Sequence, residues 1–205
     1  MRRPVAGKGR RRGAHGTEHE LLETLAGPVC AVCRRTSLTS DAYLAGVLRE
    51  GINDVAVRAA WRRRGGLCSR HWRAFRAQES PPLGAAILTE DLLTTYLTSP
   101  GRPKIACPAC EVEDHAERRY LAGLANLGAE PLAAALAAGS GFVCVRHLEA
   151  LPAGDVRELF EGRLRQLLDE LATFRRRQDY RFAAEPAGAE RDSWLRAIRA
   201  LGGDV

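Results

Sequence analysis

The chain of 205 residues can form one sizeable domain or two small ones, and 45% of its residues are hydrophobic, as in ordinary globular proteins. No apolar run approaches the ~18 residues that a membrane-spanning helix requires. The first twenty residues lack the apolar stretch of a secretory signal, so we expect no membrane association and a cytoplasmic location, where cysteines stay reduced.

The formal net charge of +6 comes from an N-terminal tail, residues 1–16. This segment holds six of the 31 basic residues and none of the 25 acidic ones, which leaves 25 of each sign in the rest of the chain. It is too poor in apolar residues to bury a core, so we predict that it is disordered. A basic tail can contact nucleic-acid phosphates non-specifically, but we favour a solvated extension without a ligand.

Helical periodicity after the tail predicts an all-α fold. The first predicted helix opens on a capping box formed by Thr17 and Glu20. The clearest helix is residues 155–179, which carries a continuous apolar stripe and would be roughly 36 Å long. We predict helices over residues 17–27, 40–51, 53–65, 69–78, 83–98, 111–127, from 131 onward, 155–179 and 192–201. The Pro- and Gly-containing segment 98–104 is a candidate hinge.

An internal duplication links the two sides of this hinge. The sequence "CAVC" at Cys30 returns as "CPAC" at Cys107, and each motif is followed by Tyr-Leu-Ala-Gly, starting at Tyr43 and Tyr120. A Cys-x-Arg-His motif then follows in both repeats. The inserts between the second and third cysteines are 34 and 33 residues long, and the repeat uses all six cysteines of the chain.

Each repeat supplies three thiols and one imidazole, the ligand count of a closed tetrahedral zinc site. In Cys-x-x-His at a helix start, the two ligands are three residues apart and share a helix face. We therefore predict two zinc-knuckle-like Cys3His sites with one Zn²⁺ each. The predicted ligands are Cys30, Cys33, Cys68 and His71 for the first site, and Cys107, Cys110, Cys144 and His147 for the second.

Arginines occupy the same position in both Cys-x-x-His motifs, Arg70 and Arg146. Three thiolates, a neutral imidazole and Zn²⁺ sum to one negative charge. A guanidinium that donates to a thiolate would offset this charge and support the ligands from behind. Solvent exposure of both arginines is an equally good interpretation.

Other interpretations of the cysteines are less favoured. An iron–sulfur cluster usually takes four cysteines, and a redox Cys-x-x-Cys expects strands around it, which the pattern does not predict. His115 and Glu111 are spaced to share a helix face, but their acidic neighbours favour a solvated surface. A closed site leaves no coordination position for substrate, and no catalytic motif appears, so we do not expect an enzyme.

The units "CPAC" and "GFVCVRH", with the later "FRRRQDYRF" and "RDSWLRAIRALGG", resemble an uncharacterised prokaryotic protein family of unknown function. The resemblance covers about residues 20–203. It implies two Cys-x-x-Cys…Cys-x-x-His modules, then a long helix, an Asp-Tyr-Arg-Phe segment and a C-terminal helix. The first motif departs from the pattern because Cys30 is not followed by proline. The family implies no activity.

The predicted organisation is a disordered basic tail (1–16), a first helical metal-binding module (17–103) and a second module with the long helix (104–205). The leading functional hypothesis is a non-catalytic zinc protein that serves as an interaction scaffold for an unknown protein partner. The alternatives are a redox- or metal-responsive sensor, since clustered thiolates can be oxidised, and an iron–sulfur protein.

Overall fold

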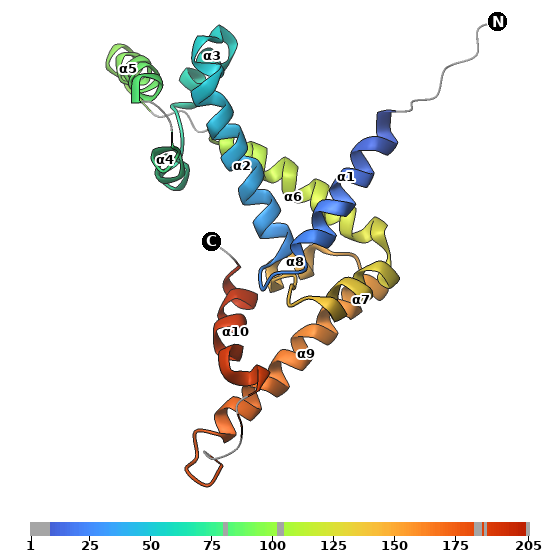
Figure 1. Ribbon diagram of the computed structural model, residues 1–205. Coiled ribbons are helices and arrows are strands. Elements are labelled where there is room, and N and C mark those ends of the chain that lie inside the picture. The colour runs from blue at the N-terminus through green and yellow to red at the C-terminus, as the bar shows by residue number, and fades with distance from the viewer. Residues whose placement is uncertain (1–8, 80–81, 102–104, 183–185, 187, 204–205) are drawn as a thin grey trace, which may run out of the picture. The chain divides into compact units, whose positions relative to one another are not determined.

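The computed structural model describes residues 9–79, 82–101, 105–182, 186 and 188–203, with side chains from residue 16 onward. This part of the chain is helical and contains no β-strand, which confirms the predicted all-α fold (Figure 1). The α-helices are α1 (Gly9–Thr24), α2 (Ala31–Arg49), α3 (Val55–Arg64), α4 (Ser69–Arg76), α5 (Pro82–Thr98), α6 (Pro108–Leu127), α7 (Ala129–Ala138), α8 (Val145–Ala150), α9 (Asp155–Arg176) and α10 (Ser193–Gly202). Two short 3₁₀ helices complete the set, η1 (Gly51–Asn53) and η2 (Ala189–Asp192).

Helices α1 and α2 begin eight and nine residues earlier than the sequence pattern indicates. Helix α1 starts at Gly9, so helical structure enters the segment predicted to be a disordered tail, and Thr17 is a buried helix residue rather than a cap. Residues 1–8 of that tail lie outside the described residues. Helix α2 starts at Ala31, nine residues before its predicted start at Ser40. Most of the residues between these two positions are polar, so the apolar helical pattern does not extend over them. The Ser40 hydroxyl donates to the carbonyl of Ser37, a local bond that lets serine stay inside a helix.

The chain divides into two compact units that differ from the predicted modules. Unit 1 comprises residues 1–35 and 118–205, and unit 2 comprises residues 36–117. The division cuts through helices α2 and α6 rather than falling in the segment 98–104, of which residues 102–104 lie outside the description. Both repeats therefore contribute to both units.

Unit 2 packs helices α3, α4 and α5 with parts of α2 and α6 around an aromatic centre. Trp72 packs edge to face against Trp61 and Phe75, and the Trp61 and Phe75 rings are tilted by 58°, with all ring centroids 5.4–6.2 Å apart. The Trp61 indole is 1% exposed and donates to the Tyr43 hydroxyl at 2.8 Å. Aliphatic side chains from α2, from α5 and from the segment just before α4 complete this core: Leu44, Val47, Leu48, Leu67 and Leu88.

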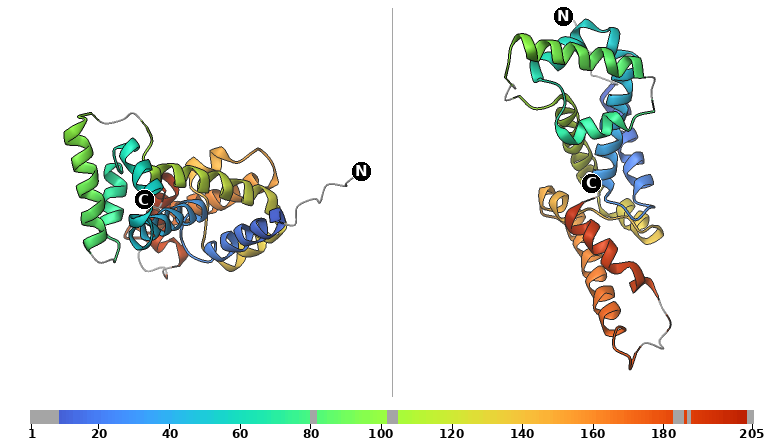
Figure 2. Two further views of the ribbon diagram at one scale, coloured as in Figure 1. Left: turned by 90° about the horizontal axis from the view of Figure 1, so that it is seen from above. Right: turned by 90° about the vertical axis from the view of Figure 1, so that its left-hand side faces the viewer.

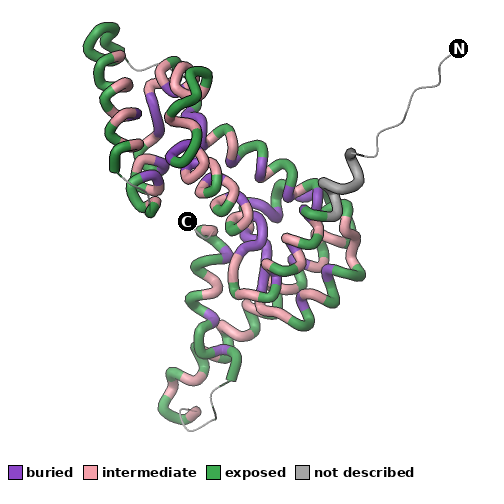
Figure 3. The backbone as a smooth tube through the Cα atoms, turned by 45° about the horizontal axis from the view of Figure 1, so that its top comes forward, coloured by how far each residue is buried: buried purple, intermediate pink, exposed green. Residues whose placement is uncertain are grey.

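Unit 1 joins α1, the start of α2 and the end of α6 to the C-terminal helices α7 to α10. Its buried side chains come from every one of its long helices, including Leu21, Leu124, Leu132 and Phe160. Helix α10 folds back beside α9, as both views show (Figures 1 and 2). Of the α9 stripe only Phe160 is buried, so this helix covers less apolar surface than its sequence leads one to expect (Figure 3).

Candidate metal centres

The eight predicted ligands form two clusters, but the structure pairs them differently from the sequence-based assignment. Site 1 consists of Cys30, Cys33, Cys144 and His147, and site 2 consists of Cys68, His71, Cys107 and Cys110. The predicted pairing within each repeat is wrong. Each Cys-x-x-Cys is completed by the Cys-x-x-His of the other repeat, and all four ligands of each site belong to one compact unit.

Helix lengths explain the crossed pairing. After Cys33 the chain runs along α2, whose 19 residues span ~28 Å, and then turns into α3, whose 10 residues span only ~15 Å. The shorter helix covers only about half of that length, and Cys68 lies in unit 2 while Cys30 and Cys33 lie in unit 1. The second repeat has the same imbalance, with 20 residues in α6 and 10 in α7. Each Cys-x-x-His is therefore left far from its own Cys-x-x-Cys and meets the other one.

Every ligand lies at the N-terminus of a helix. Cys30 and Cys107 directly precede α2 and α6, while Cys144 and Cys68 are the N-caps of α8 and α4. Each site thus joins the N-termini of two helices, whose partial positive charge stabilises thiolates. Backbone amides add to this effect: the N–H groups of Cys144 and Cys110 donate at 3.3 Å to the sulfurs of Cys30 and Cys107.

The interatomic distances match a tetrahedral ion. Zn–S bonds of ~2.3 Å and Zn–N bonds of ~2.0–2.1 Å place sulfurs about 3.8 Å apart, and sulfur and nitrogen about 3.6 Å apart. In site 1 the Cys33 and Cys144 sulfurs are 3.8 Å apart, and Nδ1 of His147 lies 3.2–3.5 Å from the three sulfurs. In site 2 the sulfur pairs are 3.4–3.8 Å apart, and Nδ1 of His71 lies 3.3–3.5 Å from the sulfurs.

The thiols also show why these clusters need a cation. Burial raises the pKa of Cys68, but hydrogen bonds from the His71 backbone and the Cys110 thiol lower it to about 7. Burial and the neighbouring sulfurs raise the pKa of Cys110 to about 12. Burial lowers the pKa of His147, yet the thiolates beside it raise the value to about 9. Three sulfurs packed this closely cannot all lose their protons unless a cation offsets their charge, so the donor set suits a divalent ion.

A buried carboxylate supports site 2 from behind. Glu113 is 8% exposed, and its Oε1 lies 3.0 Å from Nε2 of His71, the ring nitrogen that points away from the sulfurs. The same oxygen accepts from the Ser40 hydroxyl at 3.1 Å, and Arg70 donates to both carboxylate oxygens. Burial raises the pKa of Glu113, but Arg70 and His71 outweigh it and hold the pKa below its ordinary value. Glu113 therefore connects α2, α4 and α6 as a carboxylate.

The two predicted supporting arginines are both close to the sites. Arg70 acts mainly through Glu113, which raises the pKa of the guanidinium, and the Cys110 sulfur contributes further. The Arg146 guanidinium lies 2.9 Å from Nε2 of His147. Sequence reasoning missed Glu113 by assigning this acidic stretch to a solvated surface. Its signal was its spacing, three residues after Cys110 and hence on the same face of α6. Glu111 and His115 are exposed, and Glu111 pairs with Arg64 at 2.6 Å.

Backbone pairing closes site 1. The N–H of Gly141 donates to the carbonyl of Leu25 at 2.9 Å, and the N–H of Ala31 donates to the carbonyl of Phe142 at 3.0 Å. A β-carbon on Gly141 would lie only 2.5 Å from the Leu25 backbone, so this close approach requires glycine. The contact places Cys144, two residues after Phe142, beside Cys30.

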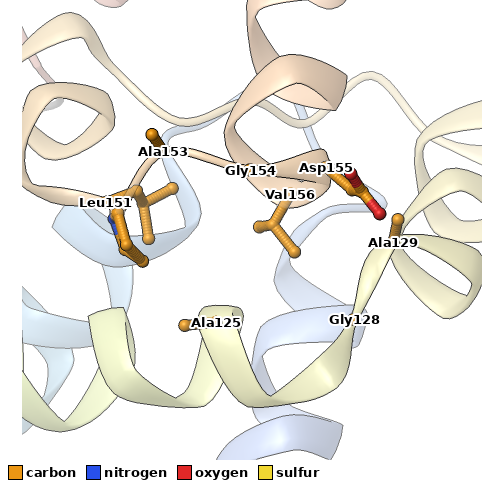
Figure 4. Close-up of a pocket in the computed structure, with 9 residues that line it drawn as sticks. Ala125, Gly128, Ala129, Leu151, Ala153, Gly154, Asp155 and Val156 are labelled. Atoms are coloured by element: carbon orange, nitrogen blue, oxygen red, sulfur yellow. The ribbon is translucent and has the colours of Figure 1, made fainter.

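A shallow hollow of about 370 Å³ lies elsewhere in unit 1 (Figure 4). Small and apolar residues form its wall, and Asp155 is the single ionisable group among them. The lining residues are Ala125, Gly128, Ala129, Leu151, Pro152, Ala153, Gly154, Asp155 and Val156. A single carboxylate is no metal-ligand set, and no second ionisable group lines the hollow to act with it, so the two Cys3His clusters are the best-defined candidate sites in the described part of the chain.

Within the described residues, no single helix is long and apolar enough to cross a bilayer. Helices α6 and α7 together have that length and apolar composition, but a bend of 101° separates them. Compared with known proteins, the chain matches no family model, no curated protein and no solved structure. The identity of the sites therefore rests on their own geometry: two Cys3His clusters with the arrangement of metal centres.

Proposed function

We propose that this protein is a zinc-dependent, non-catalytic scaffold that presents helical surfaces to a protein partner. Each of two structural Zn²⁺ ions clamps the N-termini of two helices that lie far apart in the sequence. Site 1 joins α2 to α8, and site 2 joins α4 to α6. The observation that carries the proposal is the closed ligand set, because four protein ligands per ion leave no position for a substrate or a reactive water.

The compactness of each cluster favours one zinc ion over an iron–sulfur cluster. All ligand atoms within a site lie within 4.8 Å of one another. An iron–sulfur cluster distributes its ligands over several irons and needs a wider cage, and it normally takes four cysteines rather than three and a histidine. Purified protein should accordingly be colourless, whereas a cluster would absorb visible light.

The energetic scale supports a structural role. Zinc binding in small structural sites contributes ~10–16 kcal/mol of apparent free energy at neutral pH. Whole domains are stable by only ~5–15 kcal/mol. Each site joins distant segments of the chain, since Cys33 meets Cys144 across 111 residues of sequence and His71 lies beside Cys107 across 36. The free energy of zinc binding is therefore large enough to decide whether each unit keeps its tertiary structure.

The decisive experiment counts zinc in two double variants. The crossed pairing predicts that Cys30→Ser with Cys144→Ser removes one site and leaves one zinc per chain. It also predicts that Cys30→Ser with Cys68→Ser damages both sites and leaves none. Elemental analysis of protein purified without oxygen measures both, with wild type at two zinc ions as the reference. Pairing within each repeat gives the opposite result, and a wild-type protein without zinc would contradict the proposed function itself.

A second candidate function, a redox-responsive switch, is favoured by the accessibility of some ligands. Cys33, Cys68 and Cys110 are partly exposed, and the sulfurs of Cys107 and Cys110 are 3.4 Å apart. A peroxide could take two electrons from that pair, forming a disulfide and, with two protons, two water molecules, while the metal leaves. Peroxide titration with a zinc indicator tests this function. Release at low peroxide that a thiol reductant reverses supports the switch, and retention of zinc supports the scaffold.

A further inference from the structure

Helix α10 turns its apolar side toward solvent. Four large hydrophobic side chains, spaced so that they share one side of the helix, form a surface that we call the α10 face. Its members are Trp194, Leu195, Ile198 and Leu201, which are 46%, 42%, 59% and 73% exposed. A surface helix of a soluble domain normally turns this side inward.

Polar interactions hold α10 in this orientation. The side turned toward the rest of unit 1 carries the buried Ser193 and Ala200. Between them, the Arg196 side chain is 16% exposed and pairs with Glu170 of α9 at 2.5 Å and with Asp192 at 2.9 Å. Rotating α10 to bury its apolar side would break the ion pair between Arg196 and Glu170 and expose the arginine. The outward face is therefore a built feature of unit 1.

The size of the α10 face matches one half of a protein interface. Four large side chains, about half exposed, present on the order of 400 Å² of apolar surface, in the range of the largest and often functional patch of a monomer. A standard interface buries about 800 Å² on each partner, of which a little over half is apolar. The face thus supplies most of the apolar area that one partner needs, with Trp194 as an aromatic anchor of the kind that dominates binding energy.

We infer that the α10 face binds the α10 face of a second copy of this chain, with the two helices antiparallel. A two-fold axis near the middle of α10 brings Trp194 of each copy to Ile198 of the other, so apolar surface meets apolar surface. The same symmetry brings Asp192, at the start of one helix, near Arg199, in the last turn of the other. Both residues lie on one flank of the face and are exposed; within one chain Asp192 also pairs with Arg196, and Arg199 donates to the carbonyl of Pro28 at 3.3 Å. The antiparallel arrangement also opposes the helix dipoles favourably.

Analytical ultracentrifugation of the zinc-loaded full chain tests the inference. Wild type should dimerise with a dissociation constant in the micromolar range. Ile198→Asp places a charge in the apolar centre twice per dimer and should weaken association more than about 100-fold. The matched control is Leu93→Asp on α5, where leucine is 63% exposed and outside the α10 face, and it should leave association unchanged. Zinc content and circular dichroism verify that both variants remain folded.

A charge reversal tests the antiparallel arrangement. Arg199→Asp faces Asp192 of the other copy with a second negative charge at both ends of the helix pair, and it should weaken the dimer several-fold. A wild type that stays monomeric up to about 200 µM overturns the inference even if no variant folds. So does a dimer that survives Ile198→Asp but is lost in Leu93→Asp. An Arg199→Asp dimer as tight as the wild-type dimer overturns the antiparallel arrangement. These outcomes are independent of metal identity, which the zinc analysis above tests separately.

Discussion

The contact between Glu113 and His71 leads to the sharpest prediction about the metal sites. Glu113→Gln keeps the size of the side chain and removes its charge. The amide can still accept one hydrogen bond, but it no longer polarises the imidazole as a carboxylate does, and it loses its paired contact with Arg70. Losing such a supporting carboxylate typically lowers metal affinity 10–100-fold, or about 1.4–2.7 kcal/mol. Half of the Arg70 side chain is exposed, so water can solvate it in the variant and the loss should fall within this range.

Chelator competition measures this effect at site 2 alone. In a background with Cys30→Ser and Cys144→Ser, the single remaining zinc reports site 2, and its equilibrium with chelators of graded affinity gives the binding constant. The matched control is Glu111→Gln, two residues away on the same helix, where the carboxylate is 48% exposed and pairs with Arg64. We expect the control to change affinity by less than about twofold, as surface ion pairs contribute little. Equal zinc affinity in Glu113→Gln and its parent, or an equal loss in Glu111→Gln, would refute the supporting role of Glu113.

Four further predictions concern the fold. Gly141→Ala should lower the free energy of unfolding by more than about 2 kcal/mol and weaken site 1, because the new β-carbon would press on the Leu25 backbone. Gly162→Ala lies inside α9 with open space around it and should instead raise the free energy of unfolding by about 0.5–1 kcal/mol. Thermal unfolding measures both changes. Asp91→Asn removes the shared partner of two α3 arginines and should cost about 1 kcal/mol at neutral pH in denaturant unfolding. Chelation should abolish the near-ultraviolet circular dichroism while much helix remains, and an unchanged spectrum of verified metal-free protein would exclude a structural role for the metal. Removing residues 1–16 should leave zinc content unchanged and abolish any salt-sensitive binding to nucleic acid; binding that persists would place the interface in the folded units.

The helical class and the ligand residues follow from the sequence because both depend on short-range patterns. Apolar residues three and four positions apart predict helices wherever they recur, as in α9. A ligand pair such as Cys144 and His147 is likewise a local feature, since residues three apart at a helix start always share a face. Duplication strengthened the prediction by showing the same pattern twice.

The tertiary structure alone decided which pairs meet. The local spacing predicts that Cys30 and Cys33 bind the same ion. Which Cys-x-x-His motif completes their site depends on where α2 and α3 carry the chain, and Cys144 rather than Cys68 belongs to it. The lengths needed for that conclusion depend on where helices begin, and a polar run concealed the true start of α2. The pairing of two ligand motifs that lie far apart in the sequence depends on the path of the whole chain, and no short sequence pattern predicts it.

The sequence pattern also did not predict the burial of Glu113 or the orientation of helix α10. Glu113 has the composition of a solvated acidic surface, and it is buried because Arg70, Ser40 and His71 converge on it from two other helices. Helix α10 has the pattern of a core-facing helix, and its polar side faces inward because Arg196 finds Glu170 on α9. In both cases a charged side chain is buried because its partners come from distant segments, and partners of that kind exist only once the chain has folded.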